Sequence, residues 1–267
     1  MMIPRRNSPR KNSDSNKQPH KMKIVAVEGL DKAGKNTATK ILDDYFTSKG
    51  MKVERMSFPN YDTEIGALIQ KWLKGEFLAD EKTFELLQAA DKQRAQTYIQ
   101  ECERQGVDIL LVDRYVHTEW AYGAYDNDDR WLKELTRYMR MPDAVIYLDV
   151  EPEVSMHRRG KYGDNDYYES DIERLRYTRN EFYCLFQEMN GQVDVQIVDA
   201  NQPPVIAKAQ VLKAAGRLYQ MYTGEPLDAD DVMNAVTKEE AAMIRSWTRT
   251  TSYKNRTNKH ECLPIGS

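Results

Sequence analysis

The stretch from Glu28 to Thr37 contains residues of the types and at the spacing that a phosphate-binding loop requires. Gly29, Gly34 and Lys35 stand where such a loop needs two flexible residues and then a cation. The glycines allow the backbone to wrap so that several N–H groups point at one anion, and the positive end of the following helix adds to that attraction. Lys35 can reach the outer phosphates of a nucleoside triphosphate as a point charge. The stretch therefore predicts a site for a phosphorylated ligand.

The residue after this lysine departs from the usual pattern. A phosphate-binding loop normally has Ser or Thr there, whose hydroxyl holds Mg²⁺, whereas this chain has Asn36 followed by Thr37. An amide oxygen also ligates Mg²⁺, so we expect Asn36 to be a metal ligand. The sequence leaves open whether the Asn36 amide binds the ion in the way that a Ser or Thr hydroxyl does.

Two further groups of charged residues suit phosphate chemistry. Asp113 could organise Mg²⁺ through its water shell, and Arg114 could hold a second phosphate through two parallel hydrogen bonds. Arg158 and Arg159 end a predicted helix before a glycine-bounded polar segment, and they could close over a triphosphate as a lid. The first pair could instead be a strand-end ion pair, and the second a solvated basic helix end. Phosphoryl transfer depends mainly on positioning and positive charge, so these groups form a sufficient set.

Apolar runs rich in β-branched residues alternate along the chain with segments of helical periodicity. The predicted strands are residues 23–27, 52–58, 107–112, 144–150 and 193–198, and the predicted helices are residues 36–49, 63–73, 81–105, 130–139, 171–189 and 206–222. This alternation predicts an α/β fold, a P-loop NTPase-type three-layer α/β/α domain with a five-stranded parallel sheet. Ligands collect at the carboxyl ends of such strands, which is where the phosphate loop, Phe58 and Asp113 fall.

Composition limits the other possibilities. The net charge of −3 over 267 residues argues against a dedicated nucleic-acid coat or a basic membrane binder, although local basic patches leave nucleic acid open. Three scattered cysteines indicate a reducing compartment. No stretch has the apolar length needed to cross a membrane, and the N-terminus lacks the apolar core of a secretory signal. We therefore expect a cytoplasmic protein, with a transit peptide as the weaker alternative.

The chain divides into three parts by composition. Residues 1–21 are polar and basic, which predicts a disordered tail. Residues 22–222 contain every predicted strand and should form the catalytic domain. Residues 223–267 form a C-terminal extension, with one predicted helix at 237–247 followed by a polar tail.

Several motifs, in order, resemble those of the thymidylate kinases within the P-loop nucleoside monophosphate kinases. The matching pieces are EGLDKAGK at 28–35, Phe58-Pro59, TEIG at 63–66, DRY at 113–115 with Thr118 and Ala121-Tyr122, Pro142-Asp143, YLD at 147–149, and an RRG lid at 158–160 that ends in Tyr168-Glu169. The resemblance runs from about residue 23 to residue 222. It implies ATP and Mg²⁺ as cofactors, nucleotides as substrates, and a homodimer.

The resemblance also implies roles for individual residues. Catalytic roles would fall to Lys35, Asp31, Lys32, Arg114, Arg158 and Arg159. ATP would bind to Gly29, Leu30, Asp31, Lys32, Ala33, Gly34, Lys35, Asn36 and Thr37. The acceptor would contact Phe58, Tyr61, Gln88, Lys92, Arg114, Thr118 and Tyr122, and the metal would contact Asn36 and Asp113.

The acceptor half departs from the family pattern at three positions. Tyr61 replaces an arginine, Gln88 replaces the aromatic residue that stacks on the thymine, and Lys92 replaces an arginine. Exchanging an aromatic face for an amide loses stacking worth roughly 1–3 kcal/mol per base and adds a hydrogen-bonding group. The resemblance therefore implies phosphoryl transfer to a deoxypyrimidine monophosphate, which is dTMP, dUMP or a 5-substituted dUMP that carries a polar group.

Three alternatives remain at this stage. A nucleoside kinase would need a carboxylate base near the sugar, for which Glu28 or Asp31 is available. A kinase of a modified base within DNA would need an open, basic acceptor side, and the basic residues between 249 and 259 keep that possibility open. The third alternative is a nucleotide-binding module with weak or no catalysis. Asn36 and Tyr61 suggest it, because both depart from the family pattern.

Overall fold

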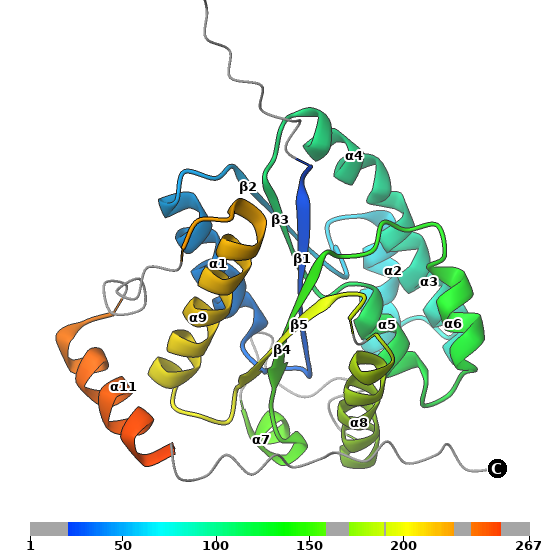
Figure 1. Cartoon of the computed structure of the whole chain (residues 1–267). Helices are drawn as coiled ribbons and strands as arrows, with labels where there is room; N and C mark the ends of the chain where they lie inside the picture. The colour runs from blue at the N-terminus through cyan, green and yellow to red at the C-terminus, as the bar shows by residue number, and fades with distance from the viewer. Residues whose placement is uncertain (1–20, 159–170, 190, 227–235, 252–267) are drawn as a thin grey trace, which may run out of the picture.

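A computed structural model describes residues 21–158, 171–189, 191–226 and 236–251 (Figure 1). Its centre is a sheet of five parallel strands in the order β2-β3-β1-β4-β5. The strands are β1 (Lys23–Gly29), β2 (Val53–Ser57), β3 (Ile109–Asp113), β4 (Ala144–Asp149) and β5 (Asp194–Asp199). The predicted five-stranded parallel sheet is thus confirmed.

Strand β1 lies in the middle of the sheet, between β3 and β4. Val25 is in register with Leu111 on one side and Ala144 on the other. A central parallel strand is covered on both faces, which explains why β1 reads as a continuous apolar run and not as an alternating one. β1 extends to Gly29, two residues beyond the predicted end, because its last residues pair with β4.

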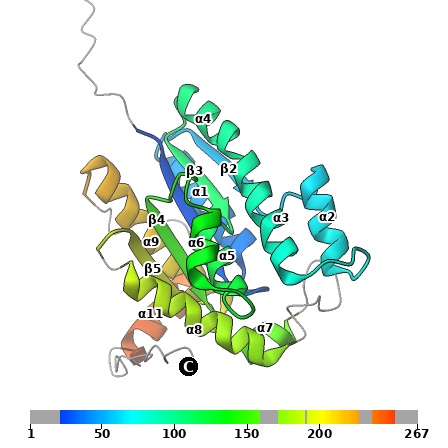
Figure 2. The same ribbon diagram turned by 90° about the vertical axis from the view of Figure 1, so that its right-hand side faces the viewer.

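Helices cover both faces of the sheet (Figures 1 and 2). The helices are α1 (Lys35–Ser48), α2 (Glu64–Leu73), α3 (Glu81–Arg94), α4 (Gln96–Arg104), α5 (Val116–Gly123), α6 (Asp129–Leu135), α7 (Pro152–His157), α8 (Ile172–Glu188), α9 (Pro204–Thr223) and α11 (Lys238–Thr251). α1 and α9 pack on each other along one face, and α3, α5 and α8 lie on the opposite face. The three layers match the predicted architecture.

The predicted long helix over residues 81–105 is two helices. The break falls at Ala95, whose backbone N–H reaches the Asp91 carbonyl at a stretched 3.4 Å. The side chain of Gln96, the next residue, donates to the Tyr115 hydroxyl at 3.0 Å and accepts from the Arg140 backbone N–H at 3.0 Å. These contacts attach the start of α4 to the loops around β3 and β4.

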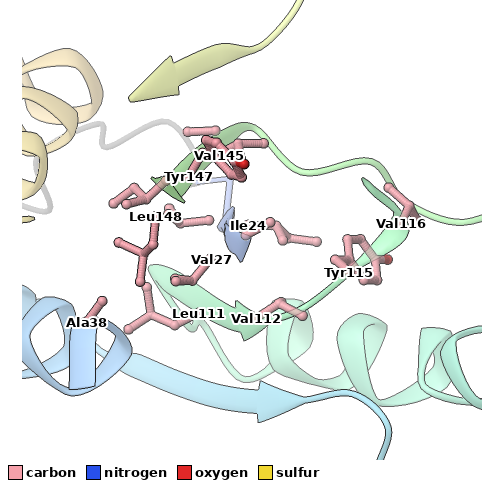
Figure 3. Packing of buried hydrophobic residues seen from close by; sticks show 14 of the residues in the cluster. Ile24, Val27, Ala38, Leu111, Val112, Tyr115, Val116, Val145, Tyr147 and Leu148 are labelled. Atoms are coloured by element: carbon pink, nitrogen blue, oxygen red, sulfur yellow. The ribbon is translucent and has the colours of Figure 1, made fainter. Parts of the chain in front are cut away.

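The core lies against both faces of β1, β3 and β4. Figure 3 shows Ile24, Val27, Leu111 and Tyr147 packed together, with Ala38 of α1 closing the same cluster. Burial of such side chains contributes roughly 1.5–3 kcal/mol each. The strands that lead into the predicted site loops therefore lie within a close-packed core.

The helix of the C-terminal extension packs on α9. Thr237 and Glu240 cap its first turn reciprocally, since the Thr237 N–H donates to Glu240 Oε2 at 2.7 Å and the Glu240 N–H donates to Thr237 Oγ1 at 3.2 Å. Ala241 and Ile244 are buried. The helix continues to Thr251, beyond its predicted end. Both predicted tails lie outside the described residues, apart from this last turn.

No helix in the described part of the chain is long and apolar enough to span a membrane.

Candidate active site

The loop between β1 and α1 has the backbone conformation that its glycines predict. Gly29 has φ 145° and Gly34 has φ 99°, both in the region that favours glycine. A Cβ at Gly29 would lie 2.7 Å from the carbonyl oxygen of Leu148, so no side chain fits there. No side chain caps the N-terminus of α1 within the described residues. This end of α1 is therefore open for phosphate oxygens, which fits the triphosphate of ATP.

Lys35 is folded back over this loop and almost fully buried, with 7% of its surface exposed. Its Nζ donates to the carbonyl oxygens of Gly29 at 3.1 Å and Leu30 at 2.8 Å. Burial, together with the nearby Arg114 charge, lowers the pKa of Lys35 to about 8, against the opposing effect of Asp31. An arriving phosphate would supply the negative charge that favours the protonated amine.

Asp31 and Arg114 connect the phosphate loop to the end of β3. The Arg114 guanidinium forms an ion pair with Asp31, and the Tyr122 hydroxyl donates to Asp31 Oδ2 at 3.0 Å. Burial alone would favour the neutral acid, but Arg114 and Lys35 outweigh it and lower the pKa of Asp31. Asp31 therefore carries a negative charge that keeps the guanidinium in place at the loop.

The predicted metal ligands come from two different elements next to the phosphate loop. The Asn36 side chain is exposed at the start of α1, and Asp113 ends β3. Burial raises the pKa of Asp113, while Lys35 and Arg114 oppose the shift. The described residues contain no group of three His, Cys, Asp or Glu side chains that could hold a metal by themselves. A hard oxygen set of one amide and one carboxylate fits Mg²⁺ when phosphate and water oxygens complete the shell.

One cavity brings together all the predicted acceptor-binding residues. Its lining consists of Asp31, Phe58, Pro59, Tyr61, Leu73, Phe84, Glu85, Gln88, Lys92, Arg114, Thr118, Glu119 and Tyr122. The predicted residues come from four separate parts of the chain, at the end of β2, α3, the end of β3 and α5. The cavity borders the phosphate loop at Asp31, which is where an acceptor phosphate would have to lie for transfer.

Two charged lining residues, Glu85 and Glu119, were not predicted. Lys92 Nζ lies 3.3 Å from Glu119 Oε2, and both side chains are buried. The signal that could have found Glu85 is its spacing, because Glu85, Gln88 and Lys92 recur at i, i+3 and i+7 on one helical face. Nothing in the sequence marks Glu119, which follows Thr118 in an aromatic-rich helix.

A second cavity, of about 400 Å³, is also lined by residues of the phosphate loop. Its lining consists of Ala33, Gly34, Thr37, Ala38, Ile41, Leu148, Arg158, Ala200, Gln202, Pro204, Val205, Ala207, Lys208, Val211 and Glu240. The residues from α9 and α11 were not predicted as site residues. They carry no motif, and only the packing of the two helices brings them beside the loop.

Arg158 spans the phosphate loop and the turn after β5. Its guanidinium donates to the carbonyl oxygens of Lys32 at 3.2 Å and Ala200 at 2.7 Å. Lys32 has φ 58°, and its neighbour Asp31 accepts from Ser155 Oγ through its carbonyl oxygen at 2.6 Å. The predicted lid therefore begins in contact with the loop. Arg159 lies outside the described residues.

Comparison with known proteins gives a consistent family. The family model described as thymidylate kinase matches residues 27–211. The thymidylate kinase of Plasmodium falciparum is 31% identical over 159 residues, which is 59% of this chain and 75% of that protein. Thymidylate kinase of Homo sapiens is 30% identical over 182 residues, 67% of this chain and 82% of that protein. The probable thymidylate kinase 1 of Saccharolobus solfataricus is 30% identical over 201 residues, 74% of this chain and 97% of that protein.

A solved structure shows the same fold. The thymidylate kinase of Candida albicans superposes with a TM-score of 0.57 at 21% identity, over 75% of this chain and 91% of that one. The sequence relatives are enzymes of one class, and that class uses ATP, generally with Mg²⁺. The motifs, the two cavities that meet at the loop and these matches agree: the chain belongs to the thymidylate kinase family, and it is a nucleoside monophosphate kinase.

Proposed function

We propose that the chain transfers the γ-phosphoryl group of ATP to a deoxypyrimidine nucleoside monophosphate and forms the diphosphate. The acceptor is dTMP, or dUMP with or without a polar 5-substituent. One observation carries this proposal: residues of the phosphate loop line both cavities. Asp31 lines the first, which we call the acceptor cavity, and Ala33 and Gly34 line the second, which we call the donor cavity. Donor and acceptor could therefore meet at the loop.

The residues at the meeting point have distinct roles in this proposal. Lys35 and the open end of α1 hold the outer phosphates of ATP, and Arg114, held in place by Asp31, meets the acceptor phosphate. Lys32, Arg158 and Arg159 add positive charge as the lid closes. ATP supplies the transferable phosphoryl group, and Mg²⁺ bound by Asn36 and Asp113 would neutralise its charge. The attacking oxygen is already anionic, so transfer in line needs no general base.

The same geometry argues against a nucleoside kinase, which would need a free carboxylate base. Asp31 is engaged by Arg114 and Tyr122. Glu28 is fully buried, and its carboxylate accepts from the Tyr115 N–H at 3.0 Å and from Thr118 Oγ1. Neither group is available to a sugar hydroxyl, whereas Arg114 suits an acceptor that already carries phosphate.

The test is ADP production from ATP and Mg²⁺ with a panel of acceptors. The panel contains dTMP, dUMP, 5-hydroxymethyl-dUMP, dCMP, dGMP and dAMP, with thymidine as the nucleoside control. Turnover with a pyrimidine monophosphate and none with thymidine supports the proposal. No turnover with any monophosphate, while ATP still binds, would refute it and favour the DNA-directed or binding-module alternatives.

The domain limits and the assembly are part of the same proposal. Residues 22–222 would form the catalytic domain, and residues 223–267 an extension whose helix α11 borders the donor cavity through Glu240. The family resemblance implies a homodimer, which we propose as the working assembly. Light scattering on the full chain would give a mass of about twice the 31.1 kDa monomer for that dimer.

A further inference from the structure

Three ionisable side chains are buried together in the wall of the acceptor cavity. Glu85 and Lys92 come from α3, and Glu119 comes from α5. Their exposed fractions are 2%, 1% and 2%. Charged side chains are rarely buried so completely without a specific role. We call these three residues the acidic cluster.

The internal pairing of the acidic cluster is incomplete. Lys92 Nζ donates to the Gln88 side-chain oxygen at 3.2 Å and forms an ion pair with Glu119 at 3.3 Å. Within the described residues, neither carboxylate oxygen of Glu119 accepts a hydrogen bond of good geometry. Buried carboxylates normally accept several hydrogen bonds, and an unsatisfied one is costly. Glu119 therefore has unused acceptor capacity beside the cavity.

Glu85 packs closely against Gly123 of α5, in the same wall of the cavity as Glu119. A Cβ at Gly123 would lie 3.1 Å from the Glu85 carboxyl carbon, so the absence of a side chain there makes room for the acid. Burial and the neighbouring Glu119 charge raise the pKa of Glu85 to about 8. Burial also raises the pKa of Glu119, against the effect of Lys92. The acidic cluster therefore places hydrogen-bond donors and acceptors side by side.

A stabilising role does not explain this arrangement, because apolar residues of similar volume usually stabilise a buried site at least as well. The remaining wall of the cavity is largely apolar or aromatic, from Phe58, Leu73 and Phe84. A few polar groups in an apolar pocket typically fix the orientation and identity of a ligand. The 5-methyl group of thymine offers no hydrogen bond to a carboxylate, whereas an amino or hydroxyl group does.

We propose that Glu119, supported by Lys92 and Glu85, selects an acceptor pyrimidine that carries a hydrogen-bond donor attached at C4 or C5 of the ring. The hydrogen-bond donor is an amino or a hydroxyl group of the base, and it donates to a carboxylate oxygen of Glu119 that accepts no other hydrogen bond within the described residues. The ring carbonyl or ring nitrogen next to it accepts from Lys92. This inference rests on the proposed transfer to a deoxypyrimidine monophosphate, and its C4 alternative, dCMP, widens the set of acceptors named there.

The first test compares kcat/KM of the wild-type chain for dTMP, dUMP, dCMP and 5-hydroxymethyl-dUMP at saturating ATP. We expect a donor-bearing acceptor to exceed dTMP by about tenfold or more, since a site built to hydrogen-bond a group rejects analogues that lack it. Preference for dCMP identifies the C4 amino group, and preference for 5-hydroxymethyl-dUMP identifies the C5 hydroxyl. A highest value for dTMP or dUMP overturns the inference but leaves the proposed function standing.

The second test is Glu119→Gln, with Glu134→Gln as the matched control on the surface. Glu134 is exposed and pairs with Arg137 at 3.2 Å, outside both cavities. We expect Glu119→Gln to reduce the preference over dTMP by about tenfold, mainly through KM of the donor-bearing acceptor, and Glu134→Gln to leave it unchanged. An unchanged preference in a folded Glu119→Gln protein would overturn the inference.

A measurement on the wild type covers the case in which Glu119→Gln does not fold. Thermal melting of the full chain is followed with each monophosphate at equal concentration and without ATP. A ligand raises the melting temperature according to its affinity. The donor-bearing nucleotide should give a larger shift than dTMP, and an equal or larger shift with dTMP contradicts the proposed selection.

Discussion

The guanidinium of Arg114 forms an ion pair with Asp31 from a backbone in the left-handed region, at φ 64°. The Arg114 N–H donates to the Val27 carbonyl at 3.0 Å, so β1 holds the residue in this conformation. Such conformations cost of order 1–3 kcal/mol for a residue other than glycine. The protein therefore keeps a strained arginine directly between the phosphate loop and the acceptor cavity.

Replacing Arg114 by lysine should weaken acceptor binding while ATP binding persists. A lysine keeps one charge but loses the two parallel hydrogen bonds that a guanidinium offers to phosphate. We expect kcat/KM for the acceptor to fall about a hundredfold, which is roughly 2.7 kcal/mol. Steady-state kinetics with each substrate varied measures this. Arg137→Lys, on the exposed surface, is the control, and an equal loss for both substrates would argue against a role specific to the acceptor.

The pH dependence of ATP binding should follow Lys35. Its lowered pKa of about 8 means that the ligand-free lysine loses its proton as the pH rises through 8. The phosphates prefer the charged amine, so Kd for ATP should increase above that pH and stay level below it. Isothermal titration between pH 7 and pH 9.5 tests this. Lys35→Met should bind weakly with a flat profile, and a sloping profile in that variant would assign the titration to another group.

Gln88→Phe should shift acceptor preference toward dTMP. The substitution adds an aromatic face worth roughly 1–3 kcal/mol per stacked base and removes the side-chain oxygen that Lys92 contacts at 3.2 Å. Competition between dTMP and 5-hydroxymethyl-dUMP measures the ratio of kcat/KM directly. Gln70→Phe, on α2 outside both cavities, is the control. An unchanged ratio in Gln88→Phe would remove Gln88 from the base-binding wall.

Asn36→Ala should raise the Mg²⁺ concentration needed for half-maximal turnover. Asn36→Ser should keep that concentration at the wild-type value or lower it. The alanine removes an oxygen ligand, and the serine supplies the hydroxyl usual in such loops. Because Asn36 is exposed, neither change should alter the melting temperature appreciably. Equal Mg²⁺ dependence in the wild type and both variants would place the metal on other oxygens.

A chain that ends at Glu225 should bind ATP more weakly and bind the acceptor normally. Removing α11 uncovers α9 and deletes Glu240 from the donor cavity, together with the pair that it makes with Lys208 at 3.5 Å. We expect KM for ATP to rise several-fold, which is the size of effect expected when one or two polar contacts to a ligand are lost. A chain that ends at Thr251 keeps α11 and is the control. An unaltered KM for ATP in the shorter chain would show that the extension does not serve the donor site.

The phosphate loop was predictable because its chemistry is local. Gly29, Gly34 and Lys35 are close together in the chain, and the conformations that the glycines adopt are ones that few other residues tolerate. The parallel sheet was predictable for a similar reason, because strands buried on both faces must be apolar along their length. The break at Ala95 was not predictable, since the residues on both sides of it favour a helix.

The acidic cluster was decided by tertiary structure. Glu85 and Lys92 form a polar stripe on a predicted helix, and such a stripe ordinarily faces water. Only the packing of α3 against α5 turns it toward Glu119 and encloses all three side chains. Burial is a property of the assembled fold, and it determines whether a carboxylate is a solvated surface group or a recognition group. The sequence by itself thus predicted the phosphate loop and its conformation, whereas the fold decided which polar groups line the cavity beside it.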